Sequence, residues 1–212
     1  MPNHQCMLYA GSPVKYLPGL AAVAKTKLQE NWRCLYLNSP PMIDQMHASL
    51  AQAGIAVAEE IEQGSLVLSS SQDHLRDGRF DVDRMLSGLA DAVGQAVSDG
   101  YTGLWATGDM RWEFGRETNF AKLVEYEYAL DRFIARQPLS GICQYHIDTL
   151  PSDVVQWGLL THQFLYINEE LSQANSHYLP SHLLTYRRPA VSGFQLQEMF
   201  ARPVEREAAN MC

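Results

Sequence analysis

The chain has 212 residues, of which 46% are hydrophobic and 19% are charged. This is the composition of an ordinary globular protein, and it excludes collagen, a coiled coil and wholesale disorder. Lys and Arg total 16 against 24 Asp and Glu, which gives a formal net charge of −8. Because phosphate binding needs clustered basic residues, we expect no direct binding of nucleic acid.

The cysteines and the N-terminal residues predict a reduced, cytoplasmic protein. Cys6, Cys34, Cys143 and Cys212 are scattered and form no CxxC pair, which is unlike a disulfide scaffold. Residues 1–5 contain no basic segment followed by an apolar one, so no signal peptide is expected. No apolar run approaches the ~18 residues that a membrane-spanning helix needs, so no contact with a membrane is expected.

Short apolar runs alternate with helical patterns along most of the chain. Strands are predicted at residues 5–10, 32–37, 55–57, 65–68, 101–107, 141–145 and 164–167. Helices are predicted at residues 16–29, 40–53, 81–98, 120–136 and 152–160, because apolar residues recur there three and four positions apart. This alternation predicts an α/β fold of three layers, in which helices cover both faces of a mainly parallel sheet.

The pattern divides the chain into a domain and an extension. The alternation of strands and helices runs over residues 1–180 and weakens beyond Pro180. We therefore predict one α/β domain at 1–180 and a C-terminal extension at 181–212. Two alternatives stay open for the extension: it forms one strand and one short helix, or it is partly disordered.

A phosphate-binding loop would have to follow the first strand, because ligands of open parallel sheets bind at the carboxyl ends of the strands. The segment there, Gly11 to Tyr16, has one Gly and no Lys followed by Ser or Thr. Gly19 to Thr26 comes closer to the phosphate-loop pattern, but it lies inside a predicted helix and has Ala24 in place of the second Gly. No functional phosphate loop is expected.

Polar, aromatic and sulfur-bearing side chains gather near the ends of the first, fifth and sixth predicted strands. We predict that nine of them bind a ligand: His4, Cys6, Tyr9, Asp109, Met110, Trp112, Cys143, Tyr145 and His146. Aromatic and thioether walls with a few polar groups are typical of a pocket for a small molecule. We therefore expect a closed pocket at these strand ends.

Three other interpretations stay open. His4, Cys6, Cys143 and His146 would suit zinc, although alternation along a strand places Cys143 and His146 on opposite faces. Cys143 with His146 or His4, oriented by Asp109, would form the nucleophilic centre of an enzyme for small organic substrates. No local nucleophile signature supports this, and a buried structural cysteine is commoner. The third interpretation is an interaction module without a ligand, which forms a homo-oligomer.

Several short motifs occur together in one order. The four motifs are His4-x-Cys6-x-x-Tyr9, Gly78-Arg79-Phe80-Asp81, the segment 103–112 and Cys143-Gln144-Tyr145-His146. Two more segments fit the same pattern: 123–127, which precedes Leu130, and Thr161-His162. Together they resemble the MEDS sensory domain, a methanogen and methylotroph module first noted in a dichloromethane-dehalogenase repressor. The resemblance spans residues 3–168.

The resemblance implies both a fold and a role. It implies a relative of RecA-like ATPases of the circadian-clock type that has no functional phosphate loop and needs no cofactor. It also implies a non-catalytic domain that binds small organic molecules, such as simple hydrocarbon derivatives, in signal transduction or transcription regulation. The family positions that carry over are His4, Cys6, Tyr9, Asp109, Trp112, Cys143 and Tyr145.

Two departures limit what the resemblance transfers. The family commonly has Glu where Asp109 stands and Asp where His146 stands, so the identity of the ligand does not carry over. The sequence also shows no helix-turn-helix and has no room for a kinase. We therefore expect the output to pass through a signalling or transcription-factor partner, or through the extension.

Overall fold

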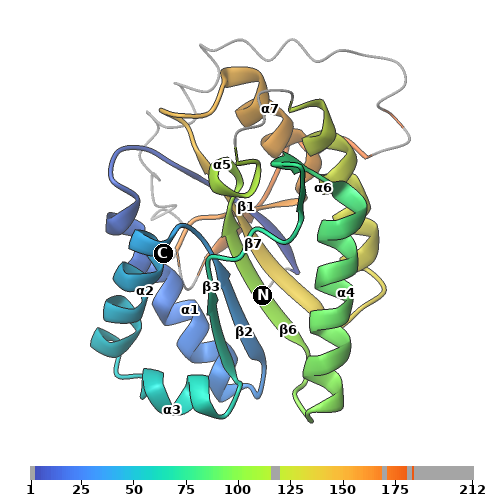
Figure 1. Ribbon diagram of the computed structural model, residues 1–212. Coiled ribbons are helices and arrows are strands. Elements are labelled where there is room, and N and C mark those ends of the chain that lie inside the picture. The colour runs from blue at the N-terminus through green and yellow to red at the C-terminus, as the bar shows by residue number, and fades with distance from the viewer. Residues whose placement is uncertain (1–2, 116–119, 169–170, 181–182, 184–212) are drawn as a thin grey trace, which may run out of the picture. The chain divides into compact units, whose positions relative to one another are not determined.

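A seven-stranded sheet forms the centre of the computed structural model, which describes residues 3–115, 120–168, 171–180 and 183. The strand order is β3-β2-β6-β7-β1-β8-β9, and all neighbours are parallel except β8 and β9 (Figure 1). The strands are β1 (His4–Tyr9), β2 (Arg33–Leu37), β3 (Leu66–Ser69), β6 (Leu104–Asp109), β7 (Leu139–His146), β8 (Phe164–Tyr166) and β9 (Ser172–Ala174). This confirms the predicted mainly parallel α/β sheet.

Helices cover both faces of this sheet, as the alternating pattern predicted. The helices of one face are α1 (Leu17–Gln29) and α2 (Pro40–Gln52), and α1 follows the short 3-10 helix η1 (Pro13–Tyr16). Those of the other face are α4 (Val82–Ser98), α6 (Ala121–Ile134) and α7 (Ser152–Thr161). The short helices are α3 (Val57–Glu62) and α5 (Met110–Glu113). The three-layer arrangement is visible in Figure 1.

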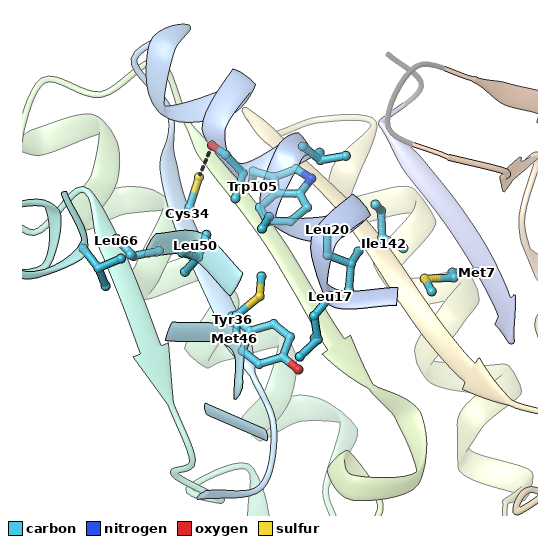
Figure 2. Packing of buried hydrophobic residues seen from close by; sticks show 14 of the residues in the cluster. Met7, Leu17, Leu20, Cys34, Tyr36, Met46, Leu50, Leu66, Trp105 and Ile142 are labelled. Atoms are coloured by element: carbon cyan, nitrogen blue, oxygen red, sulfur yellow. Dashed lines mark hydrogen bonds between the residues drawn. The ribbon is translucent and has the colours of Figure 1, made fainter. Parts of the chain in front are cut away.

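The main hydrophobic core lies between the sheet and the α1 and α2 helices (Figure 2). Strand side chains such as Met7, Tyr36 and Trp105 pack there against Leu20 of α1 and Leu50 of α2. Each of these five side chains is at most 2% exposed. Because successive side chains of a strand point to opposite faces, the neighbours of these residues along each strand point to α4, α6 and α7.

Several short stretches of the chain differ from the prediction, including α5 and β9. The strand predicted at 55–57 is wrong, since Val57 begins α3 and the positive φ of Gly54 (81°) has already turned the chain out of α2. The helix-forming Ala and Glu residues after Val57 outweigh the short β-branched run. A small hairpin of β4 (Leu75–Arg76) and β5 (Arg79–Phe80) was not predicted. Its turn is Asp77-Gly78, with both φ angles positive, as a two-residue hairpin turn requires.

Three further expectations concern particular segments. The stretch from Gly19 to Thr26 lies inside α1, where its backbone N–H groups are part of the helix and cannot cradle phosphates. Among the described residues, no helix is long and apolar enough to cross a bilayer. The described residues up to Pro180 belong to the compact unit Met1–Ser181. The predicted extension at 181–212, apart from Leu183, lies outside the described residues.

Candidate functional site

The predicted ligand-binding residues fall into two groups on opposite faces of the sheet. β1 and β7 are adjacent, with Cys6 opposite Cys143 and Tyr9 opposite His146 in the register. The residues that face α6 and α7 are His4, Cys6, Cys143 and Tyr145. Those on the α1 face are Tyr9, Asp109 and His146. Met110 and Trp112 belong to α5, beyond the end of β6. The nine residues therefore do not form one pocket.

The group on the α1 face ties the carboxyl ends of three strands together. The Tyr9 hydroxyl donates to Asp109 Oδ2 at 2.5 Å, and Asp109 Oδ1 accepts from the backbone N–H of Trp112 at 2.9 Å. His146 Nε2 donates to the Gly11 carbonyl at 2.7 Å, and the edge of its ring meets the Tyr9 ring. Burial and the charge of Asp109 raise the pKa of Tyr9, so its hydroxyl stays a donor. These contacts order the strand ends.

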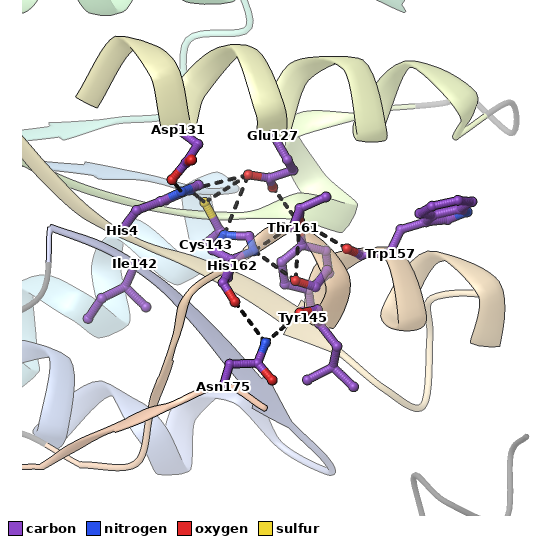
Figure 3. Close-up of polar contacts among 12 residues, drawn as sticks. His4, Glu127, Asp131, Ile142, Cys143, Tyr145, Trp157, Thr161, His162 and Asn175 are labelled. Carbon is purple, nitrogen blue, oxygen red and sulfur yellow. Dashed lines mark hydrogen bonds and ion pairs between the residues drawn. The ribbon is translucent and has the colours of Figure 1, made fainter. Parts of the chain in front are cut away.

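The group on the α6 face is part of a buried cluster of metal-ligating side chains. We call His4, Glu127, Cys143 and His162 the donor cluster. One ligand atom from each residue lies within 4.8 Å of the other three (Figure 3). Their exposure is between 0% and 6%. Glu127 comes from α6, and His162 directly follows α7.

Four distances define the geometry of the donor cluster. Glu127 Oε2 lies 3.4 Å from His4 Nε2 and 3.5 Å from His162 Nε2. Cys143 Sγ lies 3.7 Å from His4 Nε2 and 3.7 Å from Glu127 Oε2. The other two pairs of donor atoms are at most 4.8 Å apart. The four atoms, from two strands, one helix and the segment after another helix, thus lie around a common point.

A second ring of hydrogen bonds orients the donor cluster. His4 Nδ1 lies 3.2 Å from Asp131 Oδ1, and His162 Nδ1 lies 2.7 Å from the Gly158 carbonyl oxygen. Because a carbonyl oxygen only accepts, His162 Nδ1 carries the proton and Nε2 carries a lone pair. That Nε2 atom is buried and has no hydrogen-bond partner among the described residues. The Tyr145 hydroxyl donates to Glu127 Oε1.

Burial and neighbouring charges set the protonation of the cluster. Burial raises the pKa of the Cys143 thiol well above its ordinary value, and the nearby carboxylates raise it further. Burial and the charge of His4 lower the pKa of His162 to about 4. Burial opposes ionisation of Glu127, but the two histidines and the Tyr145 hydroxyl outweigh it and lower its pKa. For His4, the hydrogen bonds to Asp131 and Glu127 outweigh burial and raise the pKa.

The two chemical sets considered in the sequence are not assembled as expected. Cys6 is buried opposite Cys143 but is not part of the donor cluster, and His146 lies on the other face of the sheet. The zinc set with Cys6 and His146 is therefore not formed. Of the two pairs considered for an enzyme, Cys143 with His146 does not form, whereas Cys143 Sγ lies 3.7 Å from His4 Nε2. Asp109 contacts Tyr9 on the other face and does not orient His4, and a thiol with a raised pKa is a weak nucleophile.

Two adjacent spaces lie on the α4 side of the sheet. The outer cleft, of about 360 Å³, lies between β2, β3 and α4 and is lined by residues that include Leu35, Ser69 and Arg84. The inner cavity, of about 30 Å³, is bounded by β6, β7, α5 and α6, and His4 and Cys143 form part of its wall. The residues that line both spaces are Leu37, Met85 and Leu89.

Glu113 is the unusual polar residue in the wall of the inner cavity. It is 2% exposed, and its Oε2 atom has no hydrogen-bond partner among the described residues. Burial and the charges of Glu127 and Asp109 raise its pKa well above the ordinary value for Glu. These causes favour the neutral form of the Glu113 carboxyl, which can donate a hydrogen bond.

A comparison with protein families places the chain. Residues 3–163 match the model of MEDS, the methanogen/methylotroph, DcmR sensory domain. The chain belongs to the MEDS family. The matched range includes the whole donor cluster and Glu113. The family is described as a sensory domain, so the role of this MEDS domain is sensory. A search of curated proteins finds no match.

The nine predicted ligand-binding residues do not include Glu113, Glu127 or His162. Glu127 and His162 lie in segments that carried the resemblance, 123–127 and Thr161-His162, and that was the available signal. Glu127 looks like an ordinary acidic residue on a helix until the packing of α6 on β7 buries it completely. Glu113 stands in a four-residue helix that the strand pattern did not indicate.

Proposed function

We propose that this MEDS domain senses a small, mostly apolar molecule that binds in the outer cleft and reaches into the inner cavity. The observation that carries the proposal is that the two spaces are adjacent and share three lining residues, Leu37, Met85 and Leu89. The outer cleft, of about 360 Å³, has the size of known small-molecule sites. This site is near the ends of β2 and β3, and Met110, His4 and Cys143 line its inner part.

The walls suggest the chemistry of the ligand. Leucine and methionine side chains line both spaces, and Glu113 lines the inner cavity with a carboxyl whose raised pKa favours the neutral, donating form. A ligand with a short apolar body and one acceptor atom fits this arrangement, as simple alcohols and chlorinated alkanes do. The inner cavity, of about 30 Å³, has room for roughly two water-sized groups, since one needs ~10–15 Å³. Ethanol and dichloromethane each have three heavy atoms, so either compound would widen the inner cavity as it binds.

Signalling needs a conformational response as well as binding. A ligand shifts a protein between two states only if it binds one of them more tightly. Helix α4 forms one side of the outer cleft, and Met85 and Leu89 join it to both spaces. A ligand that widens the inner cavity moves α4 against the sheet, and a signalling or transcription-factor partner reads this movement. Neither catalysis nor a cofactor takes part in this response.

The methionine methyl groups provide a direct test. Met85 lines both spaces and Met110 lines the inner cavity, whereas Met7 and Met46 are buried in the core on the opposite face. With ¹³C-labelled methionine methyl groups, titration with ethanol or dichloromethane should give saturable shifts of Met85 and Met110 only. Shifts that do not saturate, or that are equal for all four methyl groups, would contradict the proposal.

Two glycines of α4 offer matched variants. A Cβ atom added at Gly88 or at Gly94 meets nothing within 4 Å, but only Gly88 lines the outer cleft. Both Gly88→Leu and Gly94→Leu should stabilise the helix by roughly 0.5–1 kcal/mol. Gly88→Leu should abolish the saturable methyl shifts, and Gly94→Leu should keep them. If the Gly88→Leu variant binds ethanol or dichloromethane as tightly as the wild type does, the ligand does not bind in the outer cleft.

A further inference from the structure

We infer that His4, Glu127, Cys143 and His162 form a tetrahedral site for one divalent transition-metal ion of the zinc type. The inference rests on the geometry of the donor cluster, of which His4 and Cys143 also line the inner cavity. It assigns metal binding to the donor cluster, in which Glu127 and His162 stand in place of the Cys6 and His146 of the zinc set considered from the sequence.

The spacing of the donor atoms is that of a tetrahedral zinc site. Zinc binds nitrogen and oxygen at about 2.0–2.2 Å and sulfur at about 2.3 Å, so neighbouring ligands of a tetrahedron are roughly 3.3–3.7 Å apart. Four of the six distances among the donor atoms lie between 3.4 and 3.7 Å, and the other two are at most 4.8 Å. A metal ion at the common point would therefore need little movement of the side chains.

The charges also balance around a divalent cation. The ionised Glu127 and a Cys143 thiolate supply two negative charges, and two neutral imidazoles complete the set. Without a cation, the lone pair of His162 Nε2 faces Glu127 Oε2 at 3.5 Å with no hydrogen bond between them. Metal binding releases the thiol proton and any proton on His4 Nε2 to solvent. Buried charges in proteins are normally paired or bound to metals. A cation at this point would pair with the Glu127 carboxylate and accept the lone pair of His162 Nε2.

The outer partners of both histidines match those of metal ligands. A metal-binding histidine usually donates its second N–H to a carboxylate or a backbone carbonyl. His4 has Asp131 in this place, and His162 has the Gly158 carbonyl. One thiolate, two imidazoles and a carboxylate suit zinc, cobalt, nickel or copper rather than calcium or magnesium. Four buried protein ligands are typical of a structural site.

Metal binding to the whole chain tests the inference. Protein stripped with a chelator should bind one equivalent of Zn²⁺ in competition with a chromophoric chelator. Co²⁺ should give the absorption bands of tetrahedral coordination and a thiolate charge-transfer band. Binding of less than about a tenth of an equivalent, or an octahedral Co²⁺ spectrum, would overturn the inference, since a closed site needs four protein ligands.

Two cysteines at opposite register positions give a matched pair of variants. Cys143→Ala should abolish the charge-transfer band and weaken Zn²⁺ binding by more than about 100-fold, because loss of an outer partner alone costs 10–100-fold. Cys6→Ala, a buried change on the neighbouring strand, should keep both. If the Cys143→Ala variant binds Zn²⁺ as tightly as the wild type does, the donor cluster is not the metal site.

A second measurement covers a variant that does not fold. In the wild type and in Cys6→Ala, bound Zn²⁺ should protect Cys143 from alkylation and raise the unfolding temperature. Glu127→Gln, which keeps the size of the side chain, should lose both effects. Absence of protection in the wild type would refute the metal site. The methyl shifts of Met85 and Met110 report ligand binding separately, so either proposal can fail alone.

Discussion

At the scale of residues, the buried hydrogen bond from the Tyr9 hydroxyl to Asp109 should stabilise the fold. Tyr9→Phe leaves the Asp109 carboxylate, which is 9% exposed, without its 2.5 Å donor. We expect a loss of about 1–3 kcal/mol in the free energy of unfolding, measured with urea. Tyr16→Phe is the control, because the Tyr16 hydroxyl donates to the carbonyl of Ala10 at an exposed position. Equal losses in the two variants would contradict a special role for the buried pair.

Glu113 predicts a distinct dependence of stability on pH. The titratable groups that face it are Asp109 on β6, Tyr126 and Glu127 on α6, and Cys143 on β7. Its pKa is raised in the folded state, so the folded chain holds the proton more tightly than the unfolded chain. The contribution of Glu113 to stability is therefore full below the ordinary Glu pKa of about 4.3 and is lost as the pH rises.

Glu113→Gln removes this titration while keeping the shape of the side chain. Relative to the wild type, the variant should gain stability progressively as the pH is raised from 4 to 8, as measured by urea unfolding at each pH. Glu59→Gln, an exposed change on α3, should follow the wild-type curve. A constant difference between Glu113→Gln and the wild type across this range would show that the carboxyl does not titrate as proposed.

At the scale of elements, Asp81 fixes the start of α4, which borders the proposed ligand cleft. Its Oδ1 atom accepts from the backbone N–H of Arg84 at 3.0 Å, and its Oδ2 atom lies 3.1 Å from Arg76 Nε on β4. Asp81→Ala should lower the unfolding temperature by a few degrees and speed hydrogen exchange in the first turn of α4. Asp81→Ser should keep most of the cap. Unchanged exchange in Asp81→Ala would contradict this role.

The elements that the sequence predicted well are those with long periodic patterns. The stripe of Met85, Leu89 and Val93 predicted α4, and these residues are buried against the rest of the domain. The errors involve short segments, where few residues carry the signal. Ile55 to Val57 looked like a strand because two of its three residues are β-branched, and β9 has three polar or small residues with no strand pattern.

At the scale of the whole molecule, alternation predicted the layers but not the strand order. The donor cluster depends on that order, because β1 must lie beside β7 before His4 can meet Cys143. The sequence pointed to both residues, but it gave no means of knowing that Glu127 and His162 would close the set. The cytoplasmic location, the homo-oligomer, the relation to RecA-like ATPases and the extension at 181–212 stay predictions.

The place of β1 between β7 and β8 has a consequence for synthesis of the protein. β1 emerges from the ribosome first, but its nearer partner, β7, begins about 130 residues later. At 5–20 residues per second, the apolar strand waits roughly 6–26 s for that partner, while β2, β3 and β6 can already pair. During synthesis, β1 therefore passes through a stage in which both its edges are unpaired and can bind chaperones.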